Sequence, residues 1–175
     1  VSTDDGTWLT LPSPHERLSS VVPNPEGGEY TLYAGGDTGN VLQWNGKDAW
    51  TACGELPKMD RPNVVQLDAT SSLVVAGAAQ KGPFISSDDC ATWDIERTTG
   101  IENEFAPISG GANSDEEAFT VLEVYGDRII TAGWAGFYQS DDAGITWRES
   151  PLGAGDRCQS VAFAPNFSTS GRLYI

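Results

Sequence analysis

The sequence predicts an all-β protein made of repeated four-stranded antiparallel units, and three observations support this prediction. A turn motif recurs along the 175-residue chain. Short runs of β-branched and aromatic residues recur between clusters of turn-forming residues. No stretch carries a helical period over about a dozen residues. Repeats at a spacing of roughly forty to fifty residues are typical of folds that stack one structural unit many times.

The clearest copy of the motif runs from Ser140 to Trp147, and a second copy runs from Ser86 to Trp93. Ser and Asp side chains hydrogen-bond backbone groups in tight turns, and Gly adopts a positive φ without strain. The Thr-Trp pair then begins a strand with an aromatic side chain for the core. We therefore predict a structural role for the motif residues, which are Ser86, Asp88, Thr92, Trp93, Ser140, Asp142, Gly144, Thr146 and Trp147.

Degenerate copies of the motif at 2–8 and 43–50 extend the repeat toward the N-terminus. The predicted strands group into units at 20–53, 64–96 and 118–150, with the end of a unit at 1–11 and the start of one at 160–175. This arrangement predicts a single β-propeller segment over 1–175, in which each unit is a four-stranded antiparallel blade. We expect a fragment of a larger propeller; the alternative is a four-bladed ring closed by its two half-blades.

Aromatic and sulfur side chains extend the prediction of the core. The fourth strands are expected to bury Trp8, Trp50, Trp93 and Trp147, and a third strand is expected to bury Trp44. The three cysteines, Cys53, Cys90 and Cys158, follow no metal-binding spacing. We expect them to be buried or half-buried thiols, and a Cys53–Cys90 disulfide is the alternative.

The charge of the chain argues against two classes of partner. It has 25 Asp and Glu against 10 Lys and Arg, which gives a net charge of −15. Nucleic acids and anionic membrane surfaces attract basic proteins, so we expect no nucleic-acid partner. No apolar run is long enough for a transmembrane helix, so we expect no direct membrane insertion. Neither metal-ligand spacing nor a phosphate-binding loop occurs, and we expect no metal and no cofactor.

The motif Ser-x-Asp-x-Gly-x-Thr-Trp that ends at Trp147 resembles the Asp-box, or BNR repeat, of sialidase-like propellers. The segment Val161–Phe167, followed by Leu173-Tyr174, resembles an inner-strand signature of bacterial propellers in that superfamily. The resemblance covers essentially the whole chain, with Cys90 as a departure from the pattern. It implies Asp-box hairpins between the third and fourth strands, away from any active face. Its members include sialidases, xyloglucan-active hydrolases, sortilin-type receptors and a photosystem II assembly factor, so the fold alone selects no activity.

Two functions follow as expectations. The first is a non-catalytic scaffold or binding module that presents loops to a protein or glycan partner, and assembly into a larger complex is one form of it. The alternative is a glycoside hydrolase of the Asp-box type, which needs two loop carboxylates, one with a raised pKa. A sialidase is disfavoured because the arginines form no obvious triad. The lone histidine, His15, lies in a connection, which disfavours a His-based relay. We expect no catalytic residues.

In a propeller of this type, binding loops join the second strand to the third and one blade to the next. The predicted binding face therefore carries Trp134, Asp37, Asp60, Lys81, Arg97 and Arg157. Trp134 is its strongest member, because an aromatic side chain in a Gly-rich loop can stack on a sugar or anchor a partner. The alternative for Trp134 is packing against a neighbouring blade. We expect an extracellular, periplasmic or cell-surface protein from a bacterium or archaeon.

Overall fold

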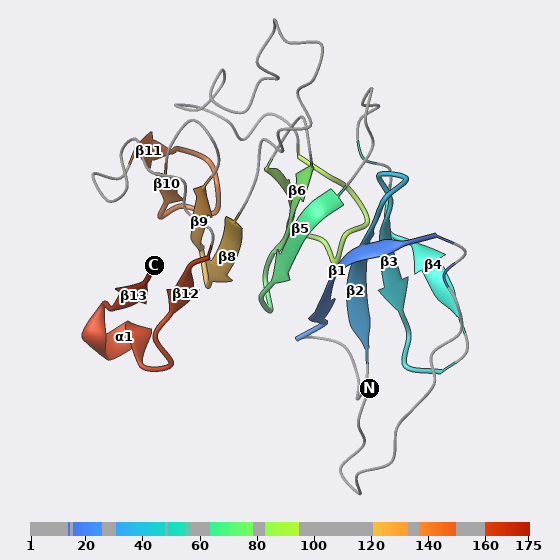
Figure 1. The fold of residues 1–175 in the computed structure, drawn as a ribbon, viewed down its shortest axis with the longest axis horizontal. Helices are drawn as coiled ribbons and strands as arrows, with labels where there is room; N and C mark the ends of the chain where they lie inside the picture. The colour runs from blue at the N-terminus through green and yellow to red at the C-terminus, as the bar shows by residue number, and fades with distance from the viewer. Residues whose placement is uncertain are drawn as a thin grey trace, which may run out of the picture.

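The computed structural model describes residues 14, 16–25, 31–47, 49–54, 56, 64–78, 83–94, 121–132, 137–149 and 160–175. The predicted segment 1–11, with its motif copy and Trp8, lies outside these residues. Within the described part, antiparallel sheets follow one another in chain order, as the colour gradient in Figure 1 shows. Every strand in these sheets pairs with the strand next to it along the chain, so each sheet is a meander.

The first sheet has four strands, which are β1 (Leu18–Pro23), β2 (Leu32–Gly36), β3 (Val41–Trp44) and β4 (Trp50–Ala52). Cross-strand pairs of aromatic and β-branched side chains stabilise such sheets. Here Val22 lies opposite Tyr33, and Trp44 lies opposite Trp50 with ring centroids 5.7 Å apart. The degenerate motif copy at 43–50 therefore forms a hairpin between β3 and β4.

The second and third sheets repeat this order. The second contains β5 (Val64–Ala69), β6 (Val74–Ala78) and β7 (Phe84–Ser86). A single antiparallel bridge between Ile85 and Asp94 stands where the sequence predicts a fourth strand. The third contains β8 (Val121–Tyr125), β9 (Arg128–Ala132), β10 (Phe137–Ser140) and β11 (Arg148–Glu149). Turn motifs connect β7 to this bridge and β10 to β11, between the third strand and the fourth position.

The last described sheet contains β12 (Ala162–Phe163) and β13 (Leu173–Tyr174). The connection between them holds a short helix, α1 (Phe167–Ser170), which the sequence analysis did not predict because four residues are too few to show a helical period. Gly171 ends the helix with φ 61°, and its N–H donates to the carbonyl of Phe167 at 2.8 Å. No helix in the described residues is long and apolar enough to cross a membrane.

The hydrophobic core lies between consecutive sheets. One cluster joins Tyr33 and Val41 of the first sheet to Leu67 and Val74 of the second. The next cluster joins the second sheet to the third through Leu73, Val75, Ile85, Leu122, Val124, Ile129, Tyr138 and Trp147. A smaller cluster sets Val161, beside β12, against the third sheet. Each sheet therefore buries its apolar faces against its neighbours, as expected for successive propeller blades.

The predicted core tryptophans differ in burial. Trp44 is 1% exposed and Trp147 is 7% exposed, so both are core residues. Trp50 and Trp93 are only half-buried, and Trp93 packs against the edge of the cluster between the first and second sheets. Within the described residues, Trp93 is followed by the single bridging residue Asp94 rather than by a strand, and its side chain is only half-buried.

Candidate functional site

The turn motif of the third sheet is held together by its own side chains. Asp142 accepts hydrogen bonds from the Ser140 hydroxyl at 2.8 Å, the Thr146 N–H at 2.9 Å and the Thr146 hydroxyl at 2.6 Å. Ser140 Oγ also accepts a bond from the N–H of Gly144 at 2.8 Å. The indole Nε1 of Trp147 donates to the Gly144 carbonyl at 3.0 Å. These bonds lock the turn in the way that Asx-type turns do.

The motif of the second sheet repeats the same pattern. Asp88 accepts from Ser86 Oγ at 2.8 Å and from the N–H and hydroxyl of Thr92 at 2.9 and 2.6 Å. In both motifs the hydrogen bonds from the Thr hydroxyl, followed by those from the Thr N–H, lower the pKa of the Asp. The indole of Trp93 differs, because it donates to the carbonyl of Cys53 in the first sheet at 2.9 Å.

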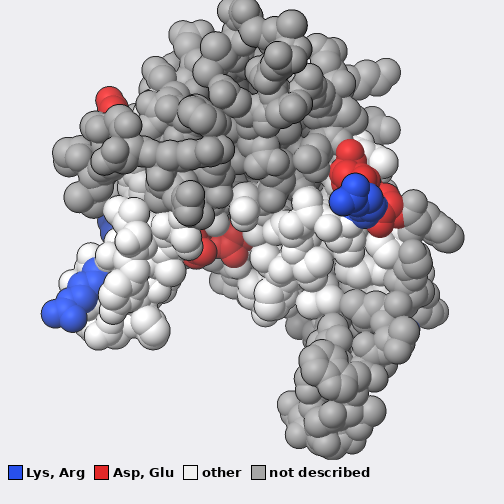
Figure 2. Space-filling view, viewed as in Figure 1, with Lys and Arg blue, Asp and Glu red and all other residues white. Residues whose placement is uncertain are grey.

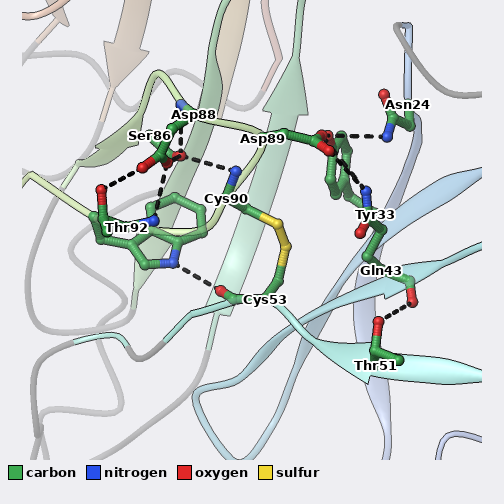
Figure 3. The surroundings of a disulfide bond; sticks show 11 residues. Asn24, Tyr33, Gln43, Thr51, Cys53, Ser86, Asp88, Asp89, Cys90 and Thr92 are labelled. Atoms are coloured by element: carbon green, nitrogen blue, oxygen red, sulfur yellow. Dashed lines mark hydrogen bonds between the residues drawn. A yellow bond between two sulfur atoms is a disulfide. The ribbon is translucent and has the colours of Figure 1, made fainter.

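The position of Gly144 faces the preceding sheet. Gly144 has φ 82°, and a Cβ atom there would overlap the Cδ1 atom of Ile85. Cys90 occupies the same place in the second motif with φ 62°, which is uncommon for a residue with a side chain. Its Cβ points across the interface between sheets, where Figure 3 shows its sulfur joined to that of Cys53.

The prediction that Cys53 and Cys90 are thiols is therefore wrong, and the alternative of a disulfide is correct. The two Cα atoms lie 5.3 Å apart, within the range of roughly 4.4–6.8 Å that a disulfide requires. Both residues are buried at the interface between the first and second sheets. Cys158 lies outside the described residues.

A polar cluster lies beside this disulfide (Figure 3). Asp89 accepts hydrogen bonds from the Tyr33 hydroxyl, from Asn24 Nδ2 at 3.4 Å and from Gln43 Nε2 at 3.4 Å. Burial, together with the hydrogen bond to Asp89 and its negative charge, raises the pKa of Tyr33. The cluster therefore fastens the second turn motif to the first sheet, and it leaves the Tyr33 hydroxyl protonated at neutral pH.

Two carboxylates lie on the first strands of adjacent sheets. Asp68 of β5 accepts bonds from the N–H groups of Val124 and Ala69 at 2.6 and 2.8 Å. Burial raises the pKa of Asp68 and outweighs these two bonds. Burial, followed by the charge of Asp68, raises the pKa of Glu123 on β8 to about 7. This pair was not predicted, because no local pattern reveals that two strands far apart in sequence lie together.

Of the six residues predicted for the binding face, the structure describes one, Asp37. Asp37 is exposed directly after β2, and its N–H donates to the carbonyl of Arg17 at 3.0 Å. The other five predicted members lie outside the described residues, and these are Asp60, Lys81, Arg97, Trp134 and Arg157. No group of three or more His, Cys, Asp or Glu side chains in the described part of the chain is arranged to hold a metal ion.

An open pocket of about 410 Å³ lies beside the β8–β9 turn of the third sheet, and the sequence analysis did not predict it. The β8–β9 turn and the third-sheet turn motif form one side of it, and α1 forms the other. Its lining residues are Tyr125, Asp127, Arg128, Asp141, Phe167, Ser168 and Gly171. The exposed Tyr125-Gly126-Asp127 turn was the only local signal of this pocket, and it reads equally well as an ordinary hairpin turn.

Comparison with known proteins agrees with this architecture. No protein-family model matches the chain, and no curated protein matches it in sequence. Among solved structures, the computationally designed Ika4 protein is similar with a TM-score of 0.59 and 12% identity over 90% of this chain and 86% of Ika4. An ancestral GH74 enzyme is similar with a TM-score of 0.59 and 16% identity over 86% of this chain. U3-55K is similar with a TM-score of 0.58 and 12% identity, also over 86% of this chain.

These similarities define the class of the protein by its fold. The chain is an all-β protein with the β-propeller fold, built from antiparallel sheets of up to four strands. It spans 21% of the GH74 enzyme and 44% of U3-55K, so it corresponds to part of each of those chains. Identities of 12–16% establish the fold and carry no activity with them.

Proposed function

We propose that this chain is a non-catalytic β-propeller module of the Asp-box (BNR) type, which presents loops to a protein or glycan partner. The observation that carries the proposal is the state of the two motif aspartates. Asp88 and Asp142 each accept three hydrogen bonds from the Ser and Thr of their own turn. A carboxylate engaged in this way is a turn former, since its oxygens have little capacity left to act on a substrate.

The Asp-box assignment is supported by where the motif occurs. It follows the third strand in both the second and the third sheet, and Ser, Asp, Thr and Trp perform the same hydrogen bonding in each turn apart from the indole partner. A repeated turn that stabilises itself gives a rigid frame. Loops at the far ends of the strands are then free to vary for binding.

A secreted or surface location is supported by the disulfide between Cys53 and Cys90, because disulfides persist in oxidising compartments. A partner other than nucleic acid is supported by the charge of −15. On the face drawn in Figure 2, the described Lys and Arg side chains stand apart from one another, and one group lies directly beside acidic side chains.

The test combines binding and turnover on the purified chain. We expect retention on an array of defined glycans, or cross-linking to a protein of the source cell, with no hydrolysis of 4-nitrophenyl glycosides. Trp134→Ala and Asp37→Ala should reduce retention, because they alter the predicted loop face. Ile145→Ala is the matched control, since Ile145 is 56% exposed in a turn at the other end of the strands. Retention that is unchanged in both loop variants would contradict the proposal.

The alternative function is a glycoside hydrolase, and one observation favours it. Glycosidases use a pair of carboxyl groups in which one has a raised pKa and acts as the acid. The pKa of Glu123 is raised to about 7 beside Asp68. Hydrolysis of any 4-nitrophenyl glycoside that disappears in both Glu123→Gln and Asp68→Asn would replace the binding proposal with this one.

A further inference from the structure

The pocket between the third sheet and α1 combines an aromatic wall with polar side chains. Its volume of about 410 Å³ falls within the range of roughly 300–1,000 Å³ that is usual for small-molecule sites. Arg128, beside the pocket, begins β9, and Ala132 ends that strand on the way to Trp134. The pocket therefore lies at the opposite end of the strand from the predicted loop face, and it is a separate site.

The rings of Tyr125 and Phe167 line the apolar wall, and the ring of Phe163 packs against both of them. The Tyr125 ring lies 5.5 Å from that of Phe163 and 5.2 Å from that of Phe167, and these two phenyl rings are 4.7 Å apart. Phe167 is 9% exposed, so it belongs to the packing beneath the surface. Tyr125 remains 40% exposed. An exposed ring that is fixed by neighbouring rings is a preorganised platform, because it loses little side-chain freedom when a ligand stacks on it.

A fixed ion-pair network supplies the polar rim. Arg128 donates through Nε to Asp141 Oδ1 at 2.5 Å, and Arg148 donates to Asp141 Oδ2 at 2.6 Å. Gln139 Nε2 also donates to Asp141 Oδ1 at 2.7 Å. Partial burial of Asp141 acts to raise its pKa, but the bonds from Gln139 and Arg128 outweigh it and lower the pKa. The guanidinium carbon of Arg128 lies 5.1 Å from the centre of the Phe167 ring, which holds the group in place.

The rim keeps both donors and acceptors available to a ligand. Arg128 uses only Nε within the described residues, so its terminal amino groups are available as donors. The carboxylate of Asp127 makes no hydrogen bond or ion pair with the described part of the chain, and it is available as an acceptor. The Ser168 and Tyr125 hydroxyls can act in either role.

The charge of the rim selects among ligands. The negative charges of Asp127 and Asp141 are balanced by Arg128 and Arg148, and the whole chain carries −15. An anionic ligand would therefore meet no net positive charge here and would be repelled over longer distances. A cation would find Asp141 already paired and would meet only the single carboxylate of Asp127. A neutral ligand with several hydroxyl groups and one apolar face matches both the rim and the ring.

We propose that this pocket binds a pyranose unit of a neutral glycan. One face of the sugar stacks on Tyr125, and its hydroxyl groups bond to Asp127 and to the terminal amino groups of Arg128. The proposal goes beyond the proposed function, because it assigns a site and a ligand class at the end of the strands that the predicted loops do not occupy. The two sites can therefore succeed or fail independently.

The test measures sugar binding by calorimetry and ligand-observed NMR, with cellotriose, maltotriose and tri-N-acetylchitotriose as neutral probes and trigalacturonic acid as the acidic one. We expect at least one neutral trisaccharide to bind more tightly than the acidic one. Tyr125→Ala should weaken this binding ~10-fold or more, and Asp127→Asn should weaken it several-fold. Tyr125→Phe keeps the ring and should retain most of the affinity, and Asp127→Asn preserves the test if Tyr125→Ala fails to fold.

Two exposed residues outside the pocket provide matched controls. Tyr174 is 57% exposed on β13, and Glu149 is exposed on β11. Tyr174→Ala and Glu149→Gln should leave sugar binding unchanged. The inference is overturned if no neutral trisaccharide binds at millimolar concentration, if the acidic probe binds best, or if Tyr125→Ala and Asp127→Asn both retain full affinity. Loss of binding in Trp134→Ala alone would instead support the loop face.

Discussion

At the scale of single residues, one position in the turn motif decides how a sheet attaches to the sheet before it. In the third sheet this position is Gly144, which has no side chain and lies flush against Ile85. In the second sheet it is Cys90, whose side chain crosses the interface with the first sheet to Cys53. The same backbone turn therefore accommodates either close apolar packing or a covalent link.

The residue that precedes Gly144 or Cys90 in the motif also contacts the preceding sheet. Ala143 packs against the hydrophobic cluster between the second and third sheets. Asp89, at the equivalent place, accepts hydrogen bonds from Tyr33, Asn24 and Gln43 of the first sheet. The contacts that this turn makes thus differ in chemistry between the two interfaces, although the turn has one geometry. The contact with the second sheet is apolar, and the contact with the first sheet is polar and cross-linked.

Glu123 gives a prediction about pH. Its pKa is raised from 4.5 to about 7 in the folded chain. The stability linked to this group is fully present below pH 4.5 and is lost as the pH rises through about 7, because the folded state then has to ionise a partly buried carboxyl beside Asp68. We expect the free energy of unfolding to fall by about 1 kcal/mol between pH 5 and pH 8, since solvent screens a half-buried group.

Urea denaturation at several pH values measures this fall, and Glu123→Gln is the variant that tests its cause. Glutamine has nearly the same shape and does not ionise, so the variant should show a flatter profile over the same range. Glu149→Gln, on the exposed strand β11, is the control and should keep the fall. An equally steep profile in Glu123→Gln would show that another group is responsible.

At the scale of elements, the turn motif is stabilised by its own hydrogen bonds and ends in a Trp residue whose indole packs between sheets. In the third sheet the Trp147 indole bonds the carbonyl of Gly144 in its own turn and joins the core with the second sheet. In the second sheet the Trp93 indole reaches Cys53 in the neighbouring sheet. The motif therefore couples local turn formation to packing between sheets.

Trp147→Ala should lower the free energy of unfolding by roughly 3–5 kcal/mol, because it removes a large side chain that is 7% exposed and also removes its hydrogen bond. Chemical denaturation followed by circular dichroism measures the loss. Ile145→Ala, two residues away and 56% exposed, should change stability by no more than about 0.5 kcal/mol. An unchanged denaturation midpoint in Trp147→Ala would contradict the placement of this indole in the core.

The all-β class and its four-stranded antiparallel sheets were predictable from sequence because they depend on local patterns. Features that arise between sheets were not predictable in the same way. Neither the proximity of Asp68 to Glu123 nor the placement of Asp89 against Tyr33 leaves a mark on neighbouring residues in the chain. The glycine position in the motif was predicted to need a positive φ, but the thiol expected at Cys90 was wrong because its partner is 37 residues away.

At the scale of the whole molecule, consecutive sheets are joined by their cores and, at one interface, by a covalent bond. The Cys53–Cys90 disulfide links the first sheet to the second across a separation of 37 residues. It lies within the cluster that also contains Tyr33 and Leu67, so covalent and apolar contacts act on the same interface. This interface is therefore expected to be the most resistant to separation under oxidising conditions.

Reduction of the disulfide should destabilise the chain by about 4 kcal/mol at most, the loop-closure value for a separation of this length. Thermal unfolding with and without dithiothreitol measures the loss. Cys53→Ala should resemble the reduced chain. Cys90→Gly should lose less, because glycine relieves the backbone at φ 62° and restores the residue found in the other motif. In the unreduced denatured chain at most one thiol should react; three reactive thiols would contradict the link.

The placement of the core between sheets also bears on how the chain can be divided. A sheet removed from its neighbours has no apolar interior of its own, so its stability depends on the units on either side, as in a one-dimensional chain of coupled elements. Any cut between sheets exposes apolar surface that was buried. The resulting fragment will aggregate unless another element covers this surface. Truncations and recombinations of this propeller should therefore keep each interface between sheets intact. The boundaries of a fragment should be chosen by the contacts between sheets.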